Sequence, residues 1–114
     1  MNLTELVQGL DLKVVTAAGG ALGRPVGGGY ASDLLSDVIA HGRKDDVWVT
    51  MQIHPNIVAV AVLKELAAIL LVNGREPAPE TVERADKEGV PILVTSLNAF
   101  DCVGRLYRLG LTGS

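Results

Sequence analysis

The stretch DVWVTMQIHPNIVAVAVLKELAAILLV, residues 46–72, decides the fold class of this chain. Its first eight residues alternate between two faces, which predicts a half-buried strand. Pro55 suits the first turn of a helix, and the apolar pattern continues that helix from Ile57 to Glu65. The aliphatic run Ala68–Val72 then predicts a second strand. A strand, a helix and a strand in this order form a βαβ unit with parallel strands and a right-handed crossover.

Strands and helices also alternate along the rest of the chain. Upstream, the apolar spacing and the turn residues predict a helix, a brief strand and a second helix, which Ser32 or Asp33 caps. Downstream, they predict a helix, a short buried strand and a final helix. These six segments cover residues 3–10, 12–15, 34–41, 81–88, 91–94 and 98–109. We therefore predict one α/β domain over residues 1–114, with a largely parallel central sheet and helices packed on it.

The composition limits the classes of partner. Aromatic residues make up 4% of the 114 residues, although the hydrophobic fraction is 48%, so the chain offers few rings on which bases could stack. The formal net charge is −3, which provides no basic surface for a phosphate backbone. We expect no nucleic-acid partner.

Cysteine use and hydropathy indicate the compartment. Cys102 is the single cysteine, so no intramolecular disulfide can form, and its place among apolar neighbours predicts an inert core thiol. The first nine residues lack the features of a signal peptide. The longest apolar stretch, Ile57–Val72, contains Lys64 and Glu65 and is too short to span a bilayer. We expect a cytoplasmic protein with no membrane partner.

Polar side chains gather where the predicted strands end. Ligands bind beyond the carboxyl ends of parallel strands, and the loops there carry Thr50, Gln52, His54, Asn73 and Ser96. These side chains donate and accept hydrogen bonds, which suits a polar small molecule. The alternative for each loop is a purely local role, in which its polar residues turn the chain or cap a helix. Three such loops at one edge of the sheet favour a ligand site.

The glycine-rich segment Gly27–Gly29 is a second candidate. Its N–H groups could form an anion-binding nest with the following helix, or the glycines could simply allow a tight bend. It matches neither the dinucleotide fingerprint nor the phosphate-binding loop of nucleotide hydrolases. Asp33 and Asp37 lie four residues apart and could form a carboxylate pair for acid–base work or Mg²⁺, although most such pairs are solvated or cap a helix.

Together these patterns predict one ligand-binding site with no catalytic residue, no metal ion and no cofactor. We place Gly28 there as well, because the glycine segment must lie close to the strand ends if Asp33 and Asp37 are to join them. The predicted ligand-binding residues are Gly28, Asp33, Asp37, Thr50, Gln52, His54, Asn73 and Ser96.

The chain resembles the DRTGG-domain family over about residues 3–111. The segment GYASDLLSD, residues 29–37, is the most specific part of this resemblance, and VWVTMQ, NIVAVA and AFD at residues 47–52, 56–61 and 99–101 add to it. The pentapeptide that names the family is absent, so no role of that motif is carried over. Members occur beside CBS domains in regulated pyrophosphatases, beside phosphotransacetylase domains, and as small stand-alone proteins. The resemblance implies a regulatory or scaffolding module that pairs with itself and has no established catalytic residues.

Three functions remain open from the sequence. The first is a non-catalytic regulatory domain, a homodimer that senses a small ligand such as a nucleotide at the strand-end loops. The second is a protein-interaction adaptor with no small ligand; the resemblance implies a redox enzyme subunit of the hydrogenase type as its partner, because some stand-alone members are encoded near hydrogenase subunits. The weakest is a small phosphotransferase or hydrolase that uses Asp33, Asp37 and His54, since the phosphate loop of a kinase is missing.

Overall fold

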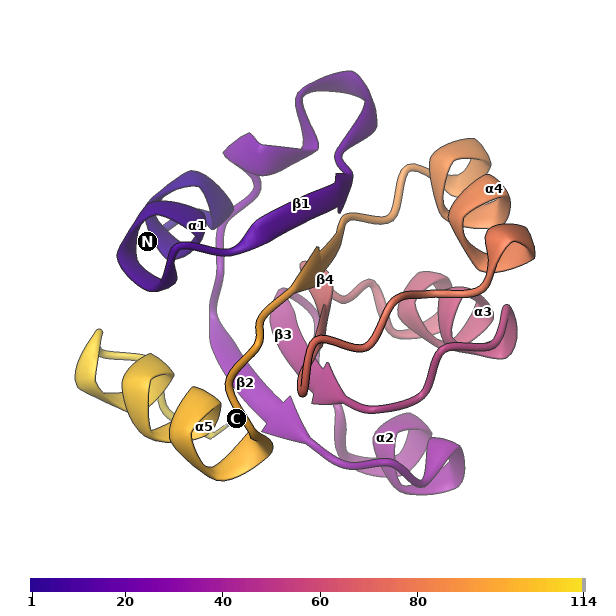
Figure 1. The fold of residues 1–114 in the computed structure, drawn as a ribbon. Helices are drawn as coiled ribbons and strands as arrows, with labels where there is room; N and C mark the ends of the chain where they lie inside the picture. The colour runs from indigo at the N-terminus through magenta and orange to yellow at the C-terminus, as the bar shows by residue number, and fades with distance from the viewer. Residues whose placement is uncertain (114) are drawn as a thin grey trace.

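The computed structural model describes residues 1–113 and contains a five-stranded sheet with helices on both sides (Figure 1). The strands are β1 (Lys13–Thr16), β2 (Gly28–Ala31), β3 (Asp46–Thr50), β4 (Ala68–Leu71) and β5 (Ile92–Val94). The α-helices are α1 (Leu3–Leu10), α2 (Leu35–His41), α3 (Asn56–Lys64), α4 (Pro79–Glu88) and α5 (Ala99–Arg108). A short 3₁₀ helix, η1 (Ala18–Gly23), follows β1. The predicted α/β class is confirmed.

The sheet is largely parallel, as predicted. Its strand order is β1-β5-β4-β3-β2; β2, β3, β4 and β5 pair in parallel, and β1 pairs with β5 in the antiparallel sense. The carboxyl ends of four strands therefore lie at one edge of the sheet. The loops that follow Ala31, Thr50, Leu71 and Val94 leave the sheet at this edge.

Each face of the sheet buries its own apolar cluster. Helices α1 and α5 cover one face, and α2, α3 and α4 cover the other (Figure 1). Leu6, Leu70 and Leu106 belong to the cluster on the first face, whereas Trp48 and Ile57 belong to the cluster on the second. Because both faces are covered, the strands consist mainly of aliphatic residues. No helix within residues 1–113 has the length and apolar character that crossing a membrane requires.

The structure corrects three local predictions. Strand β3 is buried along its whole length rather than half-buried, and it ends at Thr50 instead of Ile53. The sequence patterns did not predict β2, which begins within the glycine-rich segment. Neither Ser32 nor Asp33 caps α2, since the N-cap residue is Leu34 and no side-chain hydrogen bond caps the helix; the Ser32 hydroxyl accepts from the N–H of Leu34 at 3.2 Å instead.

Cys102 lies in the core on α5, as predicted, with its side chain fully buried. Burial raises the pKa of its thiol to about 11, because the apolar surroundings disfavour the thiolate. We expect Cys102→Ala to lower the free energy of unfolding by about 1–2 kcal/mol, since it removes a small buried group. Urea denaturation would measure this loss, and rapid alkylation of the native thiol would contradict the core assignment.

Candidate functional site

Asp33 joins the loop after β2 to the end of β3. Its Oδ1 accepts a hydrogen bond from the Thr50 hydroxyl at 2.8 Å and another from the Met51 N–H at 2.7 Å. The Thr50 Oγ1 in turn accepts from the Gln52 N–H at 3.2 Å, and Gln52 Nε2 donates to the Asp33 carbonyl at 3.0 Å. This closed set of contacts fixes the path of two loops at the carboxyl edge.

The loop after β4 joins the same cluster. Asn73 Nδ2 donates to Met51 Sδ at 3.1 Å, and the Asn73 N–H donates to the Leu97 carbonyl in the loop after β5 at 2.8 Å. We call Asp33, Thr50, Met51, Gln52 and Asn73 the strand-end cluster. Three loops that lie far apart in the sequence therefore meet at one edge of the sheet, as the parallel topology requires.

A small pocket opens beside the strand-end cluster, with a volume of about 170 Å³. We call it the strand-end pocket, and it is lined by Asp33, Met51, Gln52, Ile53, His54 and Arg75. His54 and Arg75 are exposed, so their nitrogen atoms are available to a ligand. The pocket thus combines one carboxylate with donors of both neutral and cationic type.

Five of the eight predicted residues lie together at this edge: Asp33, Thr50, Gln52, His54 and Asn73. Ser96 is exposed in the neighbouring loop after β5 and lines none of the described pockets. Gly28 lies apart from them, because it begins β2 and pairs with Asp46, the first residue of β3. Gly28 therefore lies at the amino ends of the parallel strands, opposite the carboxyl ends where the other predicted residues lie.

The glycine segment does not form a nest. The Gly27 N–H donates to the Asp45 carbonyl at 2.9 Å, and the Gly29 N–H donates to the Thr112 carbonyl at 3.0 Å. These N–H groups are used by backbone pairing at the start of β2, so they are not free to hold an anion. The N–H groups of Gly27 and Gly29 therefore stabilise the start of the strand and are not available to a ligand.

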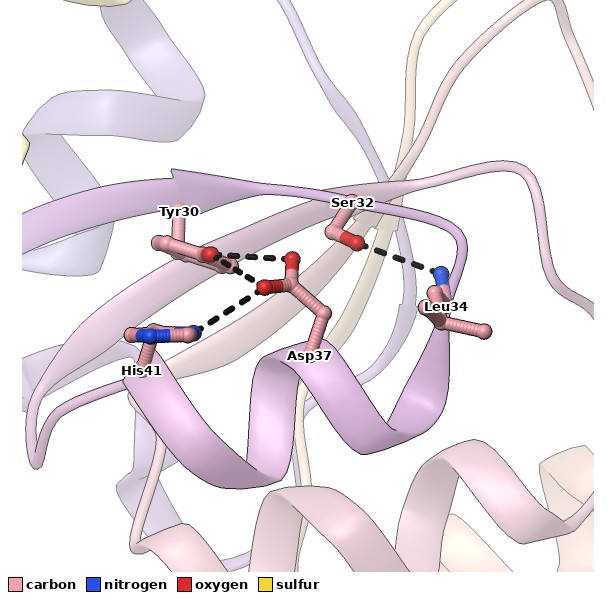
Figure 2. A network of polar contacts seen from close by, with 5 residues as sticks. All are labelled: Tyr30, Ser32, Leu34, Asp37 and His41. Carbon is pink, nitrogen blue, oxygen red and sulfur yellow. Dashed lines mark hydrogen bonds and ion pairs between the residues drawn. The ribbon is translucent and has the colours of Figure 1, made fainter.

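Asp37 belongs to a different polar cluster, which lies between β2 and α2 (Figure 2). The Tyr30 hydroxyl lies 2.9 Å from both carboxylate oxygens of Asp37, and His41 Nδ1 lies 3.0 Å from Oδ1. The rings of Tyr30 and His41 stack with centroids 6.4 Å apart. Asp37 therefore holds α2 against the edge strand and does not reach the strand-end pocket.

The contacts of Asp37 favour its ionised form. The pKa of Asp37 lies below its usual value because the hydroxyls of Ser32 and Tyr30 donate to the carboxylate, and His41 adds a further hydrogen bond and attraction. The same carboxylate raises the pKa of Tyr30, chiefly through the hydrogen bond that the neutral phenol donates. Both shifts favour an intact contact at neutral pH.

We expect the stability that Asp37 contributes to depend on pH in the acid range. Because the pKa of Asp37 is lowered in the folded state, its contribution is complete above the ordinary aspartate pKa of about 4 and is lost as the pH falls through the lowered value. Urea midpoints of wild type and Asp37→Asn should therefore differ at pH 7, and the difference should shrink as the pH falls below about 4. Parallel curves over this range would contradict the assignment.

The three residues of the predicted phosphotransferase site are not assembled. Asp33 and His54 line the strand-end pocket, but Asp37 contacts Tyr30 and His41 instead. Within residues 1–113 the structure contains no group of three or more His, Cys, Asp or Glu side chains that could hold a metal ion. The geometry gives no support to acid–base or metal chemistry by this trio.

Several residues of these clusters are not among those predicted from the sequence. Arg75 follows the Asn73-Gly74 turn and lines the pocket, a position that the turn itself could have indicated. Tyr30 and His41 were not grouped with Asp37, although the spacing of four residues between Asp37 and His41 on a helix favours a contact. The role of Tyr30 could not be found without predicting β2.

The architecture is that of an α/β module whose sheet is enclosed by helices and whose polar loops converge at one edge. The chain belongs to the DRTGG-domain family, since the model of the DRTGG domain matches residues 5–109. This match confirms the resemblance of residues 29–37 and their surroundings. Comparison with curated proteins gave no match.

The fold is also similar to a solved structure: the CBS and DRTGG domains of the regulatory region of the Clostridium perfringens pyrophosphatase, complexed with its activator diadenosine tetraphosphate. The TM-score is 0.71 at 13% sequence identity, and the match covers 92% of this chain and 45% of that one. The present chain thus spans less than half of the length of that regulatory region. At this identity the similarity shows a common fold.

Proposed function

We propose that this DRTGG domain is a non-catalytic regulatory module that senses a small ligand such as a nucleotide at the strand-end loops and associates with a second copy of itself. The observation that carries the proposal is the double hydrogen bond of Asp33 Oδ1 to Thr50 and Met51. It fixes the strand-end pocket in advance, and preorganised polar groups bind a ligand at a lower entropic cost.

The free groups of the pocket suit a phosphorylated ligand with hydroxyl or amino groups. Within residues 1–113, Asp33 Oδ2 accepts no hydrogen bond, so it can accept one from a ligand hydroxyl or amino group. The Arg75 guanidinium offers the planar set of donors that matches a phosphate. His54 supplies a further ring nitrogen at the same opening. A nucleotide carries both kinds of group.

The pocket volume bears on how such a ligand would bind. Sites that enclose drug-sized ligands measure about 300–1,000 Å³, whereas the strand-end pocket measures about 170 Å³. One copy would therefore hold only part of a nucleotide, and the rest would extend over the exposed loops. The regulatory region of the Clostridium perfringens pyrophosphatase, which contains a domain of the same fold beside CBS domains, forms a complex with a dinucleotide activator, and this supports a nucleotide as the class of ligand to test.

A protein-interaction adaptor is the second candidate, because exposed apolar side chains lie on two helices. Phe100 is 88% exposed on α5, and Leu63 is 65% exposed on α3. Such residues can mark a surface that another protein covers. A redox enzyme subunit would be one such partner.

Thermal-shift measurements would test ligand sensing directly. We expect ATP, AMP or diadenosine tetraphosphate to raise the melting temperature, because a ligand that binds only the folded state stabilises it by mass action. Arg75→Gln should weaken that binding by about tenfold, the value of one charge-assisted hydrogen bond of roughly 1.5 kcal/mol. The matched control is Arg84→Gln, which changes an exposed arginine on α4 outside the pocket.

The outcome can contradict the proposal in two ways. No shift with any of the three nucleotides at millimolar concentration would exclude nucleotide sensing. Equal loss of nucleotide binding in Arg75→Gln and Arg84→Gln would mean that the nucleotide binds through the general surface charge and not in the strand-end pocket.

A further inference from the structure

Helix α5 carries an exposed apolar stripe. Phe100, Val103 and Tyr107 are 88%, 37% and 64% exposed, and their spacing of three and four residues places them on one side of the helix. Gly104 lies on the same side, and a Cβ built at Gly104 would meet no atom within 4 Å. We call these four residues the α5 stripe. Figure 1 shows α5 at the margin of the molecule, outside the sheet.

A hollow adjoins the α5 stripe. It lies between α5, the edge strand β2 and the C-terminal segment, has a volume of about 220 Å³, and includes Tyr30, Ala31, Val103 and Tyr107 in its lining. A cavity of about 150 Å³ is large enough to hold benzene, so this hollow can accept one aromatic ring. The stripe therefore presents a protruding ring, Phe100, and an apolar recess on the same surface.

This arrangement is complementary to itself. Phe100 and Tyr107 are separated by about 10 Å along the helix axis, and the midpoint between them falls between Val103 and Gly104. A twofold axis through that midpoint, perpendicular to α5, would set two copies of the helix antiparallel and bring each Phe100 to the level of Tyr107 of the second copy. Each Phe100 then faces the recess of the second copy, and Gly104 allows the helices to approach closely.

The charges of α5 are complementary under the same symmetry. Asp101 lies in the first turn and Arg108 in the last, and a separation of seven residues places both on the same flank of the helix. In the antiparallel pair, Asp101 of one copy comes within about 3 Å, measured along the axis, of Arg108 of the second copy. Neither side chain forms an ion pair within residues 1–113, so both are available for one between copies.

We propose that the α5 stripe is the surface through which two copies of this chain associate, with the two α5 helices antiparallel across a twofold axis. The inference rests on the self-association proposed above and names its surface and contacts. Phe100 fills the recess beside Tyr107 of the second copy. Asp101 and Arg108 flank the interface as two symmetric ion pairs.

The test is the mass of the 114-residue chain by analytical ultracentrifugation over a range of concentrations. We expect wild type to have twice the monomer mass of 12.0 kDa. Phe100→Asp and Gly104→Arg should each raise the dimer dissociation constant at least about 30-fold, because a central aromatic anchor and close packing are lost. An exposed glycine within a helix tolerates a longer side chain, so Gly104→Arg should keep the wild-type melting temperature or raise it. Leu63→Asp on α3 is the matched control and should remain dimeric.

Charge reversal separates this interface from a general loss of apolar surface. Asp101→Arg should weaken the dimer about fivefold, since it places two cations side by side at each end of the interface. The double variant Asp101→Arg/Arg108→Asp should recover wild-type association. A wild type that stays monomeric at high concentration would overturn both the proposed self-association and the proposed dimer surface. The α5 stripe would then be a candidate surface for binding a different protein. A dimer that survives both Phe100→Asp and Gly104→Arg would overturn the surface alone. Nucleotide binding is measured independently in the thermal-shift assay.

Discussion

Trp48→Ala is expected to lower the free energy of unfolding by about 3–5 kcal/mol, the range observed when a fully buried aromatic residue is truncated. The Trp48 side chain is completely buried in β3 between the sheet and helices α2 and α3. Its indole N–H also donates to the Ser32 carbonyl at 2.8 Å. The substitution therefore leaves a cavity and also releases the segment that leads to Asp33. Since domains of this size are stable by only about 5–15 kcal/mol, the variant should be near the limit of folding.

Trp48→Phe separates the two contributions. Phenylalanine keeps most of the apolar volume but lacks the N–H group, so the Ser32 carbonyl loses its partner at a cost of about 1–2 kcal/mol. The chain contains one tryptophan, so far-UV circular dichroism rather than fluorescence must follow urea unfolding of both variants. A Trp48→Ala variant that unfolds at the wild-type urea midpoint would show that Trp48 does not stabilise the packing of α2 and α3 against the sheet.

The parallel core could be predicted from sequence because its signals are local. The aliphatic run at residues 68–72 and the Pro-initiated helices before and after it define βα units without reference to any distant residue. The burial of β3 could not be predicted in the same way. Its alternation does mark two faces, but α2 and α3 cover the face that carries Trp48, so both faces of the strand are buried. Only the tertiary arrangement decides between these outcomes.

The positions of the site residues that follow β3 and β4 could be predicted from the sequence. The positions of the residues that depend on β2 could not. Thr50, Gln52 and Asn73 follow recognisable strands, and the rule for parallel sheets places them at one edge. Strand β2 contains two glycines in four residues, which weakens any strand pattern, so the position of Gly28 at the opposite edge could not be inferred. The spacing of four residues suggests that Asp33 and Asp37 share one helical face, with Ser32 or Asp33 as the helix cap, but α2 begins at Leu35 with Leu34 as its N-cap, so Asp33 lies outside the helix.

Asp33→Ala is expected to have the second-largest effect on stability, about 2–3 kcal/mol. It removes the acceptor of two hydrogen bonds to one carboxylate oxygen, from the Thr50 hydroxyl and the Met51 N–H. Hydrogen bonds to a charged group contribute more than neutral ones, and Thr50 is buried with 2% of its surface exposed. The loop after β3 should then lose its fixed path. Urea denaturation at neutral pH would measure the loss.

Asp33→Asn distinguishes the architecture of the strand-end pocket from its binding chemistry. Asparagine retains Oδ1, so both hydrogen bonds to the loop after β3 can persist and the urea midpoint should stay within about 1 kcal/mol of wild type. The second oxygen, however, becomes an amide nitrogen and can no longer accept a hydrogen bond from a ligand hydroxyl or amino group. If Asp33 contacts the ligand as proposed, nucleotide affinity in the thermal-shift assay should fall about tenfold while the fold is preserved. Nucleotide binding by Asp33→Asn that equals wild type, together with its loss in Asp33→Ala, would assign Asp33 a structural role only.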